Sequence, residues 1–304
     1  MSHSHDHHHH QKDVSNIKVA FFLNLSFTII EIIGGLVTNS IAILSDAIHD
    51  LGDSLSLGLA WIFQKIAKRG RSQSFSYGYK RFSLLGAIIN SVVLIVGSVF
   101  ILYQAIPRLF SPEDTHVEGM FILAVFGLIV NGAAVLRLRK GKSLNEKVVS
   151  LHMLEDVLGW AAILVGSVVM YFFDVPVLDP IMSIGITCFI LFNVFRNIRQ
   201  ALRVILQGIP AEINLPHIKE SIETFPEVNN VHDLHVWLLD GEYNVLTTHI
   251  ALKQTLDMQQ LAVLKNKIRA LLDSEHIQHS TIEFETSDEQ CKYEHCQGND
   301  EDLI

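Results

Sequence analysis

Apolar stretches long enough to cross a membrane dominate the first two thirds of the sequence. Residues 84–106 contain no charged residue. At about 1.5 Å per residue, a helix of this length spans a hydrocarbon core roughly 30 Å thick. Comparable stretches occupy residues 17–38, 41–64, 117–137, 148–172 and 178–199. This pattern predicts six transmembrane helices, which we assign to a membrane domain over residues 17–208.

After Gly208 the pattern changes to that of a small soluble domain, which we assign to residues 209–286. Apolar residues recur at helical spacing in two segments, 215–225 and 258–272, and strand-like segments occupy 231–239, 243–252 and 280–285. Asp240 and Gly241, between the first two strands, are a hairpin signal. The expected fold class is therefore an α-helical membrane protein, followed by a small cytosolic α+β domain of order α-β-β-α-β.

The charged residues orient these predicted spans. Sixteen of the seventeen Lys and Arg residues before residue 209 lie at one end of the spans, and only Arg108 lies at the other. Because Lys and Arg concentrate in cytoplasmic loops, we expect both termini in the cytoplasm. Residues 209–304 contain 6 Lys and Arg against 18 Asp and Glu. This acidic portion has no basic cluster, which excludes a nucleic-acid-binding surface.

A polar stripe interrupts the second apolar stretch. Asp46, His49, Asp50 and Asp53 lie within 41–64, and at 100° per residue they share one face roughly 100° wide. An ionised Asp near the centre of a membrane helix costs about 2.5–3.5 kcal/mol. Such residues indicate a functional site, because a bundle interior, water or a cation must offset this cost.

The fifth apolar stretch carries the same device. His152, Glu155 and Asp156 lie within it, so His-x-x-x-Asp occurs on two predicted helices. Imidazole nitrogen and carboxylate oxygen bind Zn²⁺ at about 2.0–2.2 Å, and four such ligands can form a tetrahedron. The alternative is that these side chains only form hydrogen bonds across the bundle. The roles of Asp46, Asp50 and Glu155 stay open.

The chain resembles the cation diffusion facilitator family of divalent-metal transporters over nearly its whole length. The resemblance is carried by NSIAILSDAIHDLGDSLSLG, FSYGYKRFSLLGAIIN, HMLEDVLGWAAILVGS and VHDLHVW. It implies a central transport site at His49, Asp53, His152 and Asp156. It also implies a homodimer that exports Zn²⁺ in exchange for protons, with a metallochaperone-like cytosolic domain. We expect an integral protein of a bacterial cytoplasmic (inner) membrane.

Two positions depart from the family pattern. Relatives with a second metal site between the second and third spans use His there, whereas this chain has Phe75 and Tyr79. We therefore expect no metal in that loop. The acidic residue that usually follows YGYKRF is Ser83 here, so a role for that carboxylate does not carry over.

The cytosolic domain offers a second set of ligands. His232, His249 and Glu285 match family positions that ligate metal, and some relatives complete such a site from a tail like that of Cys291 and Cys296. Alternation along a strand places His235 on a different face from His232, which argues against both binding one ion. The alternative is that these are surface histidines and solvated cysteines.

Two tails flank the domains, a His-rich one at 1–16 and a Cys-containing acidic one at 287–304. The irregular SHSHDHHHH order favours a native metal collector, although an added affinity tag is the alternative. The chain has 3 cysteines, too few for a disulfide framework, so a reducing compartment fits.

These residues suggest how metal and protons are exchanged. Metal binding needs neutral imidazole and ionised carboxylate, so Zn²⁺ and protons compete for the same groups. Cd²⁺ or Co²⁺ would also suit two nitrogens and two oxygens. An intramembrane zinc metalloenzyme is disfavoured, because four protein ligands leave no open position for catalysis. A metal-sensing membrane scaffold leaves the intramembrane stripe unexplained.

Overall fold

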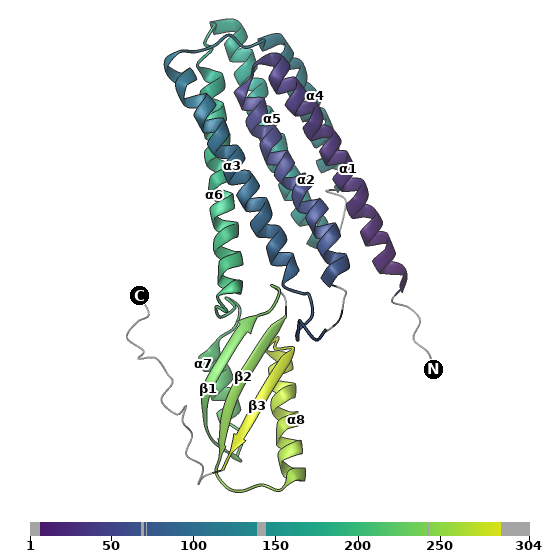
Figure 1. Cartoon of the computed structure of the whole chain (residues 1–304), viewed down its shortest axis with the longest axis vertical. Coiled ribbons are helices and arrows are strands. Elements are labelled where there is room, and N and C mark those ends of the chain that lie inside the picture. The colour runs from purple at the N-terminus through teal and green to yellow at the C-terminus, as the bar shows by residue number, and fades with distance from the viewer. Residues whose placement is uncertain (1–6, 68–69, 71, 139–143, 242, 287–304) are drawn as a thin grey trace. The chain divides into compact units, whose positions relative to one another are not determined.

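The computed structural model describes residues 7–67, 70, 72–138, 144–241 and 243–286, with side chains described from Phe21 onward except at 64, 67, 137–138 and 144–152. The chain forms two compact units. The N-terminal unit consists of residues up to 69 and of 85–198, and is helical. The C-terminal unit consists of 70–84 and of residues from 199 onward, and is built on a small sheet (Figure 1).

Long helices make up the N-terminal unit. They are α1 (His7–Thr38), α2 (Ile41–Ala67), α3 (Phe82–Phe110), α4 (Val117–Leu138), α5 (Leu144–Phe173) and α6 (Leu178–Ile205). Several extend beyond the predicted spans: α1 begins ten residues before residue 17, and α6 ends six residues after 199. Hydropathy marks the part of a helix that lies in hydrocarbon, whereas backbone hydrogen bonding continues into polar sequence.

Five of the described helices are long and apolar enough to cross a membrane: α1, α3, α4, α5 and α6. The remaining helix of the N-terminal unit, α2, has 27 residues and so has sufficient length. Its hydropathy is lowered by Asp46, His49, Asp50 and Asp53, the stripe that the sequence singles out. The sixth span therefore remains a prediction that rests on where these polar groups point.

Contacts on either side of the stripe hold α2 and α5 in place. Asn24 of α1 donates from Nδ2 to the backbone oxygen of Asp50 and to the Ser54 hydroxyl, both at 3.0 Å. On α5, Trp160 is 1% exposed and packs edge-on against Phe27 of α1, with ring centroids 6.0 Å apart. These contacts hold α2 and α5 against α1 at points close to the predicted ligands.

A hydrogen-bonded seam joins α2 to α6. The fully buried Asp179 carboxylate accepts from the Ser40 hydroxyl at 2.6 Å and from the backbone N–H groups of Ile41 at 2.8 Å and Ala42 at 3.3 Å. A helix N-terminus has unsatisfied N–H groups and attracts negative charge. Asp179 therefore caps α2 from a neighbouring helix, and a 2.6 Å hydrogen bond between the Ser45 and Ser183 hydroxyls continues the seam.

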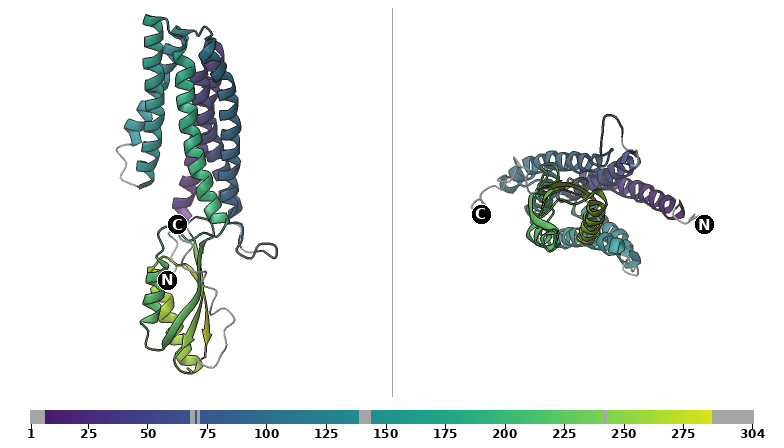
Figure 2. Two further views of the ribbon diagram at one scale, coloured as in Figure 1. Left: turned by 90° about the vertical axis from the view of Figure 1, so that its left-hand side faces the viewer. Right: turned by 90° about the horizontal axis from the view of Figure 1, so that it is seen from below.

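The C-terminal unit confirms the predicted order α-β-β-α-β. Its elements are α7 (Leu215–Glu223), β1 (Val228–Leu238), β2 (Asn244–Leu252), α8 (Met258–Ser274) and β3 (His279–Glu285). β2 lies in the middle, antiparallel to β1 and parallel to β3. Figure 2 shows α7 and α8 against one face of the sheet, where the apolar core lies. The hairpin turn contains Gly241 with φ +105°, a backbone conformation that glycine adopts readily.

The segment 70–84 contacts this sheet. The ammonium of Lys80 lies 3.6 Å from the ring centroid of Tyr243 and 3.8 Å from Asp240 Oδ2. The rings of Tyr77 and His279 meet edge-on at 6.0 Å. Lys80, which the sequence marks only as a topology signal, therefore also binds the tip of the β1–β2 hairpin.

Candidate metal centres

Three of the four predicted transport ligands lie together between α2 and α5. His49 Nε2 is 3.8 Å from Asp53 Oδ2 and 3.8 Å from Asp156 Oδ1. One ligand atom from each residue falls within 4.8 Å of the others. Their side chains are 17%, 27% and 7% exposed, respectively. His49 and Asp53 share a face because they are one helical turn apart.

This spacing is slightly wider than a bound ion would require. A tetrahedral Zn²⁺ with bonds near 2.0 Å holds its ligand atoms about 3.3 Å apart. Small side-chain movements would bring these three groups to that distance. The donor set of imidazole and carboxylate also suits Zn²⁺ and similar divalent ions.

The fourth predicted ligand is placed only by its backbone. His152 lies in α5, one turn before Asp156. Its side chain is outside the part of the chain for which side chains are described. Its contribution to the site stays a prediction based on the His-x-x-x-Asp spacing.

The other acidic residues of the stripe are buried but do not join this group. Asp46 and Asp50 are each 4% exposed, and Glu31 of α1 lies close to both. Asp46 Oδ1 faces Gly159 of α5, where a larger residue would press against the carboxylate. Glu155, by contrast, is exposed on α5. Of the polar stripe on α2, only His49 and Asp53 therefore belong to the close group of possible metal ligands.

The C-terminal unit has a second and tighter group, one residue from each strand. His232 of β1 lies directly opposite His249 of β2, and Glu285 comes from β3. Glu285 Oε1 is 2.6 Å from His249 Nδ1, and its Oε2 is 3.2 Å from His232 Nε2. Alternation along β2 places this group on the sheet face opposite α7 and α8.

The buried His232 fits a metal ligand. Its ring is 5% exposed. Neither ring nitrogen is hydrogen-bonded among the described residues, although Nε2 lies 3.2 Å from Glu285 Oε2. Buried polar groups are normally hydrogen-bonded, so such an atom requires an explanation. A divalent cation at Nε2 would provide one and would also bind the adjacent Glu285.

Sequence reasoning missed two acidic residues beside this group. Asp233 Oδ2 and Glu283 Oε2 each lie 3.6 Å from His249 Nε2. The signal was present, because Asp233 stands inside VHDLHVW and Glu283 lies two residues before Glu285. The strand positions alone did not show that both carboxylates approach the same imidazole nitrogen.

The expectation that His235 and His232 lie on different faces is wrong. A register shift occurs between the two, with Asp233 at φ +48°, so three residues on β1 oppose two on β2. This bulge returns His235 to the face of His249. His235 is nevertheless 59% exposed and hydrogen-bonds Asp233 Oδ1 at 2.8 Å, outside the close group.

The remaining sequence candidates are placed as follows. Cys291 and Cys296 lie outside the described residues, so their part in a metal site stays a prediction. Phe75 and Tyr79 contact each other, with ring centroids 4.8 Å apart. The Ser83 hydroxyl donates to the Lys80 backbone oxygen at 3.0 Å.

Comparison with known proteins matches both units to parts of cation efflux proteins. Residues 17–206 match a family described as the cation efflux transmembrane domain, and residues 210–287 match the cation efflux protein, cytoplasmic domain. The cadmium, cobalt and zinc/H(+)-K(+) antiporter of Bacillus subtilis is 32% identical over 94% of this chain and 92% of its own. The metal cation efflux system protein CzcD of Cupriavidus metallidurans is 34% identical over 93% and 89%, respectively. The zinc transporter ZitB of Escherichia coli is 30% identical over 98% and 94%.

Proposed function

The chain belongs to the cation efflux, or cation diffusion facilitator, family, and from this premise we propose that it exports zinc from the cytosol in exchange for protons. The observation that carries the proposal is the approach of His49, Asp53 and Asp156 within 4.8 Å. Two helices contribute these groups. A cation is what most simply offsets the cost of placing such groups in a membrane.

In this proposal His152 completes a site of two imidazoles and two carboxylates. A tetrahedral site of this kind binds Zn²⁺ only when the imidazoles are neutral and the carboxylates are ionised. Protons and Zn²⁺ therefore compete for the same four groups. Protons arriving from the outside would release the ion, and the protonated site would then return to face the cytosol.

Alternating exposure requires the site to change between two conformations. Each ligand shifts the equilibrium only by its differential affinity for the two states. Zn²⁺ would favour the state in which α2 and α5 bring four ligands together, and protons would favour the state in which they separate. The spacing of 3.8 Å around His49 Nε2 suits a site that must release its ion.

The arrangement in the membrane follows from the same proposal. We take α2 as the sixth span, with its polar stripe facing the bundle and both termini in the cytoplasm. The C-terminal unit would bind metal through His232, His249 and Glu285 and would pair two copies into a homodimer. Cd²⁺ and Co²⁺ are further proposed substrates, since the Bacillus subtilis relative is named for them. The kinship with transporters disfavours the metalloenzyme and scaffold alternatives.

The proposed exchange is tested in reconstituted vesicles that contain a pH-sensitive dye. Zn²⁺ added on the side of the C-terminal unit should enter and drive protons out, so the dye reports alkalinisation inside. Parallel assays with Cd²⁺, Co²⁺, Ni²⁺ and Mn²⁺ define the range of substrates. Zinc uptake with no proton movement at any imposed pH gradient would reject the exchange. No uptake of any metal would reject the transport function.

A further inference from the structure

A network of polar contacts joins separate segments at the predicted outer end of the helices. Arg108 of α3 donates to the backbone oxygen of Asn39 at 3.0 Å and to its side-chain oxygen at 2.8 Å. Arg108 also pairs with Glu113 of the α3–α4 loop at 2.7 Å, and Asn39 donates from Nδ2 to Glu113 Oε2 at 3.3 Å. We call these three residues the outer network. It holds the α1–α2 turn against α3 and against the loop that follows α3.

Arg108 has no substitute at this end of the molecule. It is the only Lys or Arg residue on the outer side of the predicted spans, and its side chain is 14% exposed. The end of α1 also contacts the start of α4, because the His116 N–H donates to the Thr38 backbone oxygen at 2.8 Å. That second contact carries no charge. Removing the Arg108 guanidinium therefore leaves Asn39 and Glu113 without a cation between them.

An apolar layer lies between the outer network and the proposed transport site. Its members with no exposed surface are Ala42 and Ile43 of α2, Met120 and Ala124 of α4, and Ile163 of α5. Trp160 of the same layer is one helical turn outward from Asp156 and is 1% exposed. A Cβ added at Gly127 of α4 would overlap its ring, so α4 and α5 are in close contact here. A metal ion cannot cross this layer in the present conformation, because apolar side chains do not replace its hydration.

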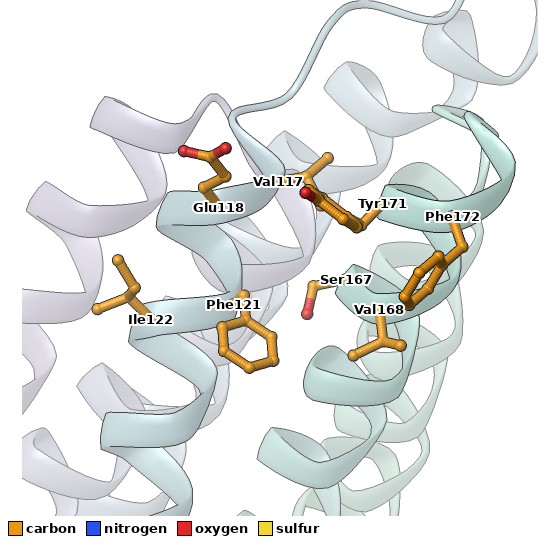
Figure 3. Close-up of a pocket in the computed structure, with 8 residues that line it drawn as sticks. All are labelled: Val117, Glu118, Phe121, Ile122, Ser167, Val168, Tyr171 and Phe172. Carbon is orange, nitrogen blue, oxygen red and sulfur yellow. The ribbon is translucent and has the colours of Figure 1, made fainter.

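The contact between α4 and α5 does not close this end by itself. Near their outer ends, a groove of about 320 Å³ separates the two helices on one side. Figure 3 shows Phe121 of α4 and Val168 of α5 on opposite walls of this groove. The apolar layer is completed by Ala42 and Ile43, which lie in the first turn of α2. Its closure therefore depends on where α2 begins, and the outer network holds the turn that sets this position.

We propose that the outer network is a gate contact: Arg108 holds the first turn of α2 over the apolar layer, and its bonds to Asn39 and Glu113 break when the ion is released to the outside. The inference rests on the proposed transport function, which makes the outer end the side of release. A contact that is present in only one conformation stabilises that conformation alone, so its loss shifts the population toward the other. A purely structural contact would persist in both conformations.

The first test removes the contact and measures access from the outside. Ile43→Cys is introduced into the full-length protein with the native cysteines changed to serine, and a membrane-impermeant thiol reagent is added on the outer side. Arg108→Gln should raise the labelling rate by about tenfold, the scale of a lost charge-assisted hydrogen bond. Arg203→Gln, at the opposite end of the helical unit, is the matched control and should leave the rate unchanged.

A second reporter separates opening of the gate from loss of the fold. Val194 of α6 is 2% exposed and lies away from the outer end. Val194→Cys should stay protected when Arg108→Gln is added. Equal acceleration at both reporters would overturn the proposal, because Arg108 would then hold the whole helical unit together. An unchanged labelling rate of Ile43→Cys would overturn it as well.

The second test locks the outer end and measures transport. A Cβ added at Gly119 would lie 4.0 Å from the Thr38 Cβ, a separation that a disulfide can span. Oxidation of the Thr38→Cys/Gly119→Cys pair should stop zinc uptake, and a reductant should restore it. Thr38→Cys alone should be insensitive to the oxidant. Full uptake by the locked protein would overturn the proposal, because a lock does not harm a purely structural contact. No uptake by wild type would count against the transport function alone, since the labelling test does not depend on transport.

Discussion

The two ligand groups of this protein use the same kinds of side chain but differ in how completely they are assembled. Between α2 and α5, His49 Nε2 stands 3.8 Å from two carboxylates. On the sheet, Glu285 lies 2.6 Å from His249 and 3.2 Å from His232. The first group is therefore wider than the spacing of about 3.3 Å around a tetrahedral ion, whereas in the second His249 and Glu285 lie closer than that and share a hydrogen bond.

This difference follows from the elements that hold each group. Adjacent strands are joined by backbone hydrogen bonds, which fix His232 opposite His249. Helices α2 and α5 are held together mainly by side-chain packing and can shift against each other. A site on strands suits retention of metal, whereas a site between helices suits capture and release. The contrast predicts that damage to one group should leave the other working.

The largest expected effect is the loss of transport on removal of Asp156. Asp156→Ala should lower zinc uptake into everted vesicles by at least about 100-fold, because even second-layer partners of a metal contribute 10–100-fold to affinity. Zinc binding by the C-terminal unit should not change. Glu155→Ala, one residue earlier on the exposed side of α5, is the matched control. Uptake at the wild-type rate by Asp156→Ala would remove α5 from the site.

The converse variant is His232→Ala on the sheet. It should weaken zinc binding by the C-terminal group by about 10–100-fold or more, measured by calorimetry on the full chain. Transport through the membrane site should stay measurable. His235→Ala removes an exposed imidazole outside the close group and serves as the control. If both variants weaken binding equally, the group is not the metal site that its geometry indicates.

A smaller effect concerns the dependence of transport on pH. Protonated imidazole cannot bind metal, so protons compete with Zn²⁺ for the site and zinc uptake should fall as the pH on the cytosolic side is lowered. His49→Asp replaces one of the two proposed imidazole ligands by a carboxylate, a weaker base that competes less well for protons. The acidic limb of the pH–rate profile should therefore move to lower pH. The same change at the exposed His235 should leave the profile in place.

The smallest expected effect is on stability. Asp179→Ala removes the acceptor for the Ser40 hydroxyl and for two N–H groups at the start of α2. Leaving buried donors unsatisfied costs about 1–3 kcal/mol, so the thermal midpoint of the helical unit should fall by several degrees. Asp114→Asn on the exposed loop should leave it unchanged. No shift in Asp179→Ala would mean that the seam contributes little to holding α2.

Much of the fold follows from periodicity alone. The apolar stretches located the membrane helices, and alternation with turn signals located all three strands of the C-terminal unit. Helix ends were less predictable, because α1 and α6 continue into polar sequence. The predicted span of α2 is less hydrophobic than the other five for a physical reason. The residues that form its site are the residues that lower its mean hydropathy.

The candidate sites were predictable where the sequence pattern is local. The spacing of one helical turn placed His49 and Asp53 on one face of α2, and the same spacing identified His152 and Asp156 on α5. Relations between distant segments were not predictable in this way. Asp179 reads as an acidic residue near an outer loop, yet it caps a helix 138 residues earlier in the chain. The bulge at Asp233 likewise defeats simple alternation, because a single residue with positive φ changes which side chains share a face.

The central claim is that α2 and α5 share one divalent ion. Anomalous scattering at the zinc absorption edge, recorded from crystals of the zinc-loaded full-length protein, tests it most directly. We predict a peak bonded at about 2.0–2.2 Å to His49, Asp53, His152 and Asp156, in addition to one on the sheet. Zinc on the sheet alone in transport-competent protein, with the four membrane side chains pointing away from one another, would contradict the claim.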